Sequence, residues 1–133
     1  MGLAVYIEAD DALTMPRLEQ ALSMAGACEL DATDDALEAA FVSGLRLHSE
    51  RAVADSRIYA EDTKGMVFDV ARRCSLRLKG PEPDGHSQLG DLDRLARSIA
   101  QVCSSRFVIS FQFETILYWR DEAGLHRQED NPA

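Results

Sequence analysis

The chain has 133 residues, of which 46% are apolar and 28% charged, a composition typical of one globular domain and not of a disordered chain. The run from Met1 to Glu8 lacks the basic start of a signal peptide, and no stretch approaches the ~20 apolar residues of a membrane span. We therefore expect a cytoplasmic protein with no membrane partner.

Negative charge is concentrated at the start of the chain. The formal net charge is −9, and residues 1–38 hold nine acids against one base, whereas residues 39–133 hold 14 acids and 13 bases. A local negative patch repels nucleic acid and attracts basic partners. This distribution favours a basic protein partner and disfavours nucleic acid.

The first elements are a strand and a helix. Residues 3–7 are apolar and rich in β-forming side chains, which predicts a strand. Thr14 is a helix-capping residue, Pro16 suits a first helical turn and Gly26 ends helices, which together predict a helix between Thr14 and Gly26. Its buried face would carry Leu18, Leu22 and Ala25.

The following segments predict short strands. Residues 27–30 indicate a strand that leads into an acidic loop at 31–35. The segment 36–48 is open between strand and helix, and we favour a strand for its later part because residues 45–48 alternate. Residues 49–64 are polar, which suggests a hairpin or an irregular edge.

Two more strands and a helix follow. Residues 66–70 and 74–78 each show a period of two, which predicts strands, and the Pro- and Gly-rich run 79–90 predicts a loop. A second helix is expected to open at Asp91 or Asp93. Its apolar stripe is Leu92, Leu95, Ile99 and Val102.

Residues 107–119 are β-branched or aromatic at nearly every second place, which predicts one long central strand. A turn at 120–124 and a short arm at 125–127 should follow, and the tail 127–133 should fray. The order of elements predicts a single α+β domain over 1–133, with a largely antiparallel sheet and two helices packed on one face.

Two groups of polar residues are candidates for binding a partner. On the predicted long strand, one face presents a row of Ser110, Gln112 and Glu114, which suits a solvated face, partner contact or, as the weakest alternative, catalysis. The other group is the acidic cluster Glu29, Asp31, Asp34, Asp35 and Glu38. The cluster lacks the glycine and 12-residue frame of a calcium loop, which leaves a solvated surface or a binding patch for a basic partner.

Other reactive residues indicate no catalytic or metal site. The three histidines share no ligand spacing, and the three cysteines lack the paired spacing of a zinc site and sit in apolar contexts, which predicts buried free thiols. We expect no catalytic residue, no metal and no cofactor. The histidines are His48, His86 and His126, and the cysteines are Cys28, Cys74 and Cys103.

The opening Ala4-Val-Tyr-Ile-Glu8, with Ser110-Phe-Gln-Phe-Glu114 and Tyr118-Trp-Arg-Asp-Glu-Ala-Gly-Leu125 near the end, resembles the bacterial immunity proteins of polymorphic-toxin and type VI secretion systems. The resemblance implies a protein with no reaction of its own, which occludes the active site of a cognate toxin domain such as a nuclease, deaminase or NADase. Such toxins present basic clefts, to which an acidic surface is complementary.

Two other hypotheses stay open. One is a small-molecule or regulatory-ligand binding domain with a pocket between the sheet and the 80–90 loop. An enzyme ranks last, because no pairing of a nucleophile with a base can be found in the sequence. The sequence does not specify the oligomeric state.

Overall fold

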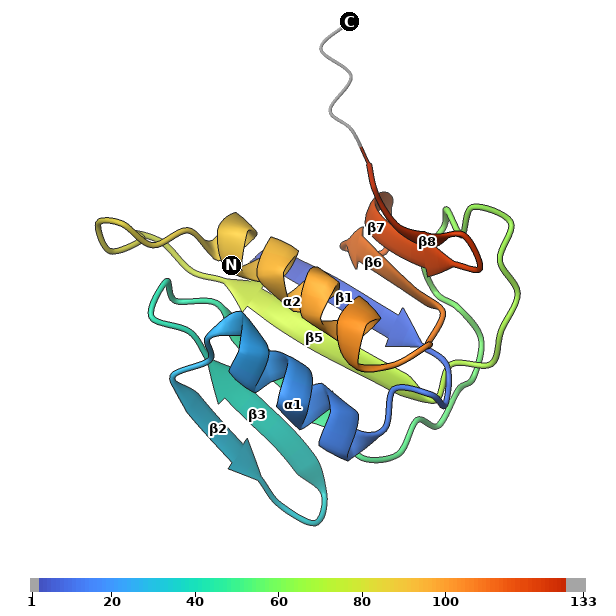
Figure 1. Ribbon diagram of the computed structural model, residues 1–133, viewed down its shortest axis with the longest axis horizontal. Coiled ribbons are helices and arrows are strands. Elements are labelled where there is room, and N and C mark those ends of the chain that lie inside the picture. The colour runs from blue at the N-terminus through green and yellow to red at the C-terminus, as the bar shows by residue number, and fades with distance from the viewer. Residues whose placement is uncertain (1–2, 129–133) are drawn as a thin grey trace, which may run out of the picture.

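The computed structural model describes residues 3–128 and contains one eight-stranded sheet in the order β2-β3-β4-β5-β1-β6-β7-β8. Each neighbouring pair is antiparallel, and both helices lie on one face (Figure 1), which confirms the predicted α+β class. The strands are β1 (Leu3–Ala9), β2 (Glu29–Ala32), β3 (Ala36–Ala40), β4 (Arg46–Glu50), β5 (Arg72–Leu78), β6 (Phe107–Phe111), β7 (Thr115–Asp121) and β8 (Gly124–Arg127).

Helix α1 (Met15–Ala25) begins and ends as its capping residues predict. The Thr14 side chain accepts a hydrogen bond from the Arg17 amide, and Gly26 adopts φ 100°, a left-handed conformation that glycine tolerates at a helix end. Helix α2 (Gln88–Val102) begins earlier than predicted, because Ser87 caps it in place of Asp91 or Asp93. The two helices pack against each other and against the sheet.

Strand β1 occupies the middle of the sheet. It pairs along its whole length with β5 and over five positions with β6. Val5, Ile7 and Ala9 are fully buried against the helices, because alternate strand residues point to the same face. The centre of the sheet is therefore β1, and not the segment 107–119.

The predicted long strand at 107–119 is a hairpin made of β6 and β7. Gln112 and Phe113 have φ of 53° and 63°, so the chain reverses between the strands, and the ring of Phe113 stacks on Tyr6 with ring centroids 3.9 Å apart. A shift of register between Ile109 and Ser110 accompanies the turn. As a result Ile116 and Tyr118 are buried, whereas Leu117 and Trp119 are half-buried.

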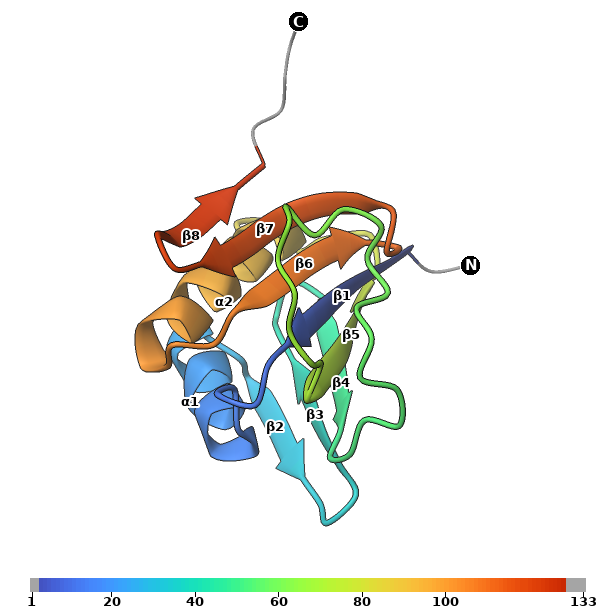
Figure 2. The same ribbon diagram turned by 90° about the vertical axis from the view of Figure 1, so that its right-hand side faces the viewer.

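The segment from 51 to 71 contains no strand, so the prediction at 66–70 was wrong. The segment crosses the sheet face opposite the helices (Figure 2), where Ala60 and Met66 pack against Val108 and Ile116. An alternating apolar pattern arises here because one side of an irregular segment rests on the sheet. We call residues 51–71 the covering segment.

The ambiguous stretch 36–48 forms two strands, β3 and β4, joined by a turn in which Phe41 N–H donates to Leu45 C=O. Strand β2 begins two residues later than predicted, so Asp31 belongs to a strand and not to a loop. No helix in the described part of the chain is both long and apolar enough to cross a bilayer. Of the tail expected to fray, Arg127 ends β8, and residues 129–133 lie outside the described residues.

Candidate functional site

Among the residues that the structure describes, no helix lies on one face of the sheet. This helix-free face presents Tyr6, Glu8, Glu38, His48, Ser75 and Ser110, as strand alternation and the pairing register require. The covering segment lies over β1, β6 and β7 and over the Arg73 end of β5, and it leaves β2 to β4 and the rest of β5 uncovered (Figure 2). The helix-free face therefore has a covered half and an open half, the latter bearing Glu29, Asp31, Glu38, Arg46, His48, Ser75 and Arg77.

The strand register aligns polar side chains across the open half. Asp31 is opposite Glu38, Glu38 is opposite His48, and His48 is opposite Ser75. Directly opposed residues on one face have Cβ atoms about 4.5–5.5 Å apart, so these side chains form a continuous row. The Glu38 carboxylate lies 3.3 Å from Nδ1 of His48.

The row borders two neighbouring hollows. The first, of about 450 Å³, has acids from β2 and β3 at one side and Arg46 and Arg77 at the other. The second, of about 320 Å³, shares His48 and Ser75 with the first and extends to Tyr59 under the covering segment. Together they form a groove that is open to solvent and runs across the strands, and its charged side chains are most numerous in the first hollow.

All five acids of the predicted cluster lie on the β2–β3 hairpin. Glu29, Asp31 and Glu38 border the first hollow, and Asp34 and Asp35 lie in the turn. The Arg51 guanidinium donates to the backbone C=O of Asp34 at 2.7 Å and to that of Thr33 at 2.9 Å, which fixes the turn. The structure therefore brings together acids that the sequence spreads over ten positions.

The predicted polar row of the long strand is not formed. Ser110 is 1% exposed, and its Oγ is the one buried side-chain oxygen or nitrogen within residues 3–128 that has no hydrogen-bond partner. Gln112 and Glu114 are exposed in the β6–β7 turn and not on a strand face. The three residues therefore present no common surface, because the chain turns at Gln112.

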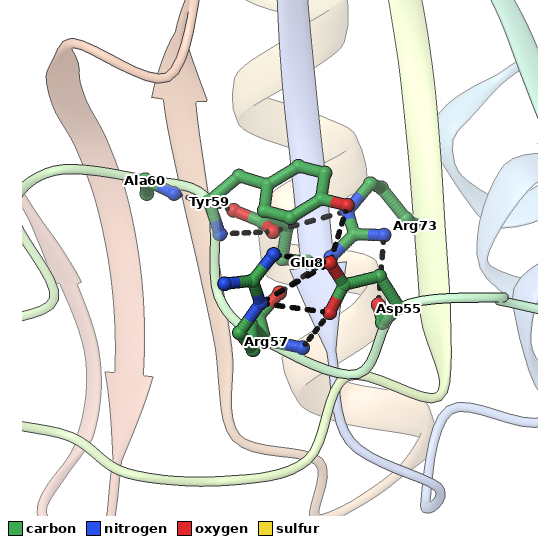
Figure 3. A network of polar contacts seen from close by, with 6 residues as sticks. All are labelled: Glu8, Asp55, Arg57, Tyr59, Ala60 and Arg73. Atoms are coloured by element: carbon green, nitrogen blue, oxygen red, sulfur yellow. Dashed lines mark hydrogen bonds and ion pairs between the residues drawn. The ribbon is translucent and has the colours of Figure 1, made fainter.

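Sequence reasoning missed a buried carboxylate, that of Glu8. This residue is fully buried and accepts hydrogen bonds from the Tyr59 amide at 2.7 Å, the Ala60 amide at 3.0 Å and Nε of Arg73 at 3.1 Å (Figure 3). Its signal in the sequence is a lone acid in a strand whose neighbours are apolar. Glu8 connects the central strand to the covering segment.

A second carboxylate completes this network on the outside. Asp55 accepts hydrogen bonds from the Arg57 guanidinium and, at 2.9 Å, from the Tyr59 hydroxyl, and these contacts hold the pKa of the Asp55 carboxyl well below its usual range. The Arg73 guanidinium lies over the ring of Tyr59, 3.9 Å from the centroid (Figure 3). Hydrogen bonds to charged side chains therefore hold the covering segment against β1 and β5.

The chemistry of the open half suits recognition better than catalysis. Glu38, His48 and Ser75 follow one another as in a hydrolase triad, but within residues 3–128 no hydrogen bond joins His48 to Ser75. The peptide groups around Ser75 pair with β4 and β1, so they cannot donate to an oxyanion. No group of three metal-ligating side chains occurs in the described chain.

The histidines and cysteines occupy separate places. His48 and His86 are exposed and His126 is half-buried beside Asp121, 3.0 Å from its carboxylate. Cys74 is buried, and burial raises the pKa of its thiol to about 11. Cys28 is exposed and Cys103 half-buried, so the prediction of three buried thiols holds for Cys74 alone.

Comparison of the chain with family models, curated proteins and solved structures found no match in any of the three.

Proposed function

We propose that this protein is a cytoplasmic immunity protein, a stoichiometric inhibitor of a bacterial toxin domain. The open half of its helix-free face would occlude the active site of the toxin. The observation that carries the proposal is the gathering of Glu29, Asp31, Asp34, Asp35 and Glu38 on one uncovered hairpin. An exposed cluster of one sign is of little use to the fold, because like charges opposite each other in a sheet are destabilising. A basic partner would relieve that repulsion.

The shape of the open half supports a protein partner over a small ligand. Its two hollows are open to solvent and share His48 and Ser75, and charged side chains make up half of the residues that line the first. Small-molecule sites are typically enclosed and mostly apolar. A broad groove with acids along one side suits a basic rim around a toxin's active site, such as that of an enzyme acting on nucleic acid or a nucleotide.

The proposal is tested with the toxin domain encoded next to this protein's gene, where an immunity protein is expected. The toxin is induced in bacteria with and without this protein, and the purified pair is passed over gel filtration. We expect survival only with the protein present, and a complex of the two chains. Killing in its presence, with no complex, would refute the proposal.

Matched charge variants then test the surface. Asp31→Lys should slow association most strongly at low salt, because this charge steers the encounter. The control is Glu122→Lys, which changes an exposed acid in the β7–β8 turn, at the other edge of the sheet. Equal association rates for the two variants would exclude the open half as the contact surface.

A further inference from the structure

Strand β2 is an edge of the sheet, and within residues 3–128 no strand pairs with its outer side (Figure 1). Its hydrogen-bonding pattern follows from the turn, where Thr33 N–H donates to Ala36 C=O at 2.8 Å. In an antiparallel pair, hydrogen-bonded positions alternate, so Thr33, Asp31 and Glu29 turn their peptide groups toward β3. The N–H and C=O groups of Leu30 and Ala32 therefore point outward from the sheet.

The side chains of β2 alternate in character as well. Glu29 and Asp31 point to the helix-free face, whereas Leu30 and Ala32 point to the face that carries the helices. All four are exposed, and Leu30 has 37% of its surface accessible. An added strand would thus meet acids on one face and apolar side chains on the other.

We propose that β2 captures an extended segment of the partner as a ninth strand, a segment with basic and apolar residues in alternation. The inference rests on the proposed function and specifies how the partner is held. Backbone hydrogen bonds to Leu30 and Ala32 would supply affinity. Lys or Arg side chains opposite Glu29 and Asp31 would supply specificity.

A second copy of this chain does not fit the same edge. If two β2 strands paired about a two-fold axis at Leu30, Glu29 of each would lie opposite Asp31 of the other. Like charges directly opposed on one face are destabilising, and each chain carries a net charge of −9. The acids therefore discourage self-pairing and select a basic strand.

The probe for the test is a capped peptide of alternating arginine and valine, seven residues long. Its valines should lie opposite Leu30 and Ala32, with their N–H groups directed at β2. We expect hydrogen exchange at the amides of Leu30 and Ala32 to slow at least tenfold when the peptide is added. A peptide of the same composition with its arginines in one block should give less than a twofold change.

Methylation of peptide nitrogens separates backbone pairing from simple charge attraction. Methyl groups on the valine amides should weaken binding at least tenfold, whereas methyl groups on the arginine amides, which point away from β2, should leave it within twofold. Equal effects of the two methylations, or slowed exchange elsewhere but not at Leu30 and Ala32, would overturn the proposal.

A protein variant gives an independent measurement. Ala32→Pro removes an N–H group that points outward and breaks no hydrogen bond to β3. The variant should therefore keep its melting temperature and bind the peptide at least tenfold more weakly. The same variant should fail to protect cells from the toxin. Protection equal to that of the wild type would refute edge capture and leave the inhibitor function standing, whereas failure of the wild type itself would refute that function.

Discussion

The covered and open halves of the helix-free face place a glutamate side chain in opposite environments. In the covered half, the carboxylate of Glu8 is fully buried and receives three hydrogen bonds, one of them from Arg73. In the open half, the side chain of Glu38 is 66% exposed. Its carboxylate lies 3.3 Å from Nδ1 of His48. The first carboxylate organises the fold, and the second is available to another molecule.

The difference follows from the cost of removing charge from water. A buried carboxylate is tolerated only when donors replace its hydration, and the covering segment supplies the amides of Tyr59 and Ala60 for that purpose. The acids of the β2–β3 hairpin remain hydrated, so contact with a basic partner would cost them little desolvation free energy. Burial thus distinguishes the structural carboxylate of Glu8 from the carboxylates proposed to bind a partner more clearly than charge does.

Removing the buried carboxylate should have the largest effect. Glu8→Ala leaves Arg73 and two backbone amides without their acceptor, so the free energy of unfolding should fall by about 3–5 kcal/mol. Urea denaturation measures the loss, and faster tryptic cleavage after Arg57 would show release of the covering segment. Glu38→Ala is the matched control and should change stability by less than about 0.5 kcal/mol. Similar losses for both variants would remove the distinction between the halves.

The apolar contacts of the covered half should be next in magnitude. Ile116 is 3% exposed beneath the covering segment, whereas Leu30 on the open edge is 37% exposed. We expect Ile116→Ala to lower the free energy of unfolding by about 2–4 kcal/mol and Leu30→Ala by less than about 1 kcal/mol. If thermal and urea unfolding showed the two truncations to be equivalent, the covering segment would not contribute a core of its own.

Acid should weaken the covered half through Asp55. Because the folded-state pKa of this carboxyl lies below its unfolded value, its stabilising contribution is present above about pH 4 and is lost as pH falls further. Asp55→Asn should remove that part of the acid dependence, which urea midpoints at a series of pH values would show. A variant with the same acid profile as the wild type would mean that the Asp55 contacts do not stabilise the fold.

The smallest effect on stability should come from the open half, and with the opposite sign. Asp31→Lys places a base opposite Glu38, so the free energy of unfolding should rise by about 0.5 kcal/mol. The same change should slow association with a basic partner. A variant that is both less stable and unchanged in association would contradict the view that these acids are kept for binding.

The helices could be predicted because their signals are local. Thr14, Pro16 and Gly26 each act through the backbone of one turn, and the stripe of α2 follows a regular period. The hairpin at 107–121 could not, because its turn uses Gln112 and Phe113 at positive φ, where glycine or asparagine would be the usual signal. The stacking of Phe113 on Tyr6 accompanies this conformation and depends on a residue more than a hundred positions away.

The candidate site was predictable only in part. The acidic cluster emerged from charge counting, and the hairpin keeps its members together because they are close in sequence. The groove depends on the register of β4 and β5, which places His48 beside Ser75 and which no local pattern reveals. The role of Glu8 likewise depends on a segment 51 residues away, although a lone acid between apolar strand residues gives a detectable hint.

The position of β1 also has a consequence for how the molecule is made. Residues 3–9 form the middle of the sheet, yet their two neighbours, β5 and β6, leave the ribosome some seventy and a hundred residues later. Until then this apolar segment has no partner strand on either side. We therefore expect the nascent chain to depend on chaperones that shield its beginning, and refolding in vitro to be slow for a domain of this size.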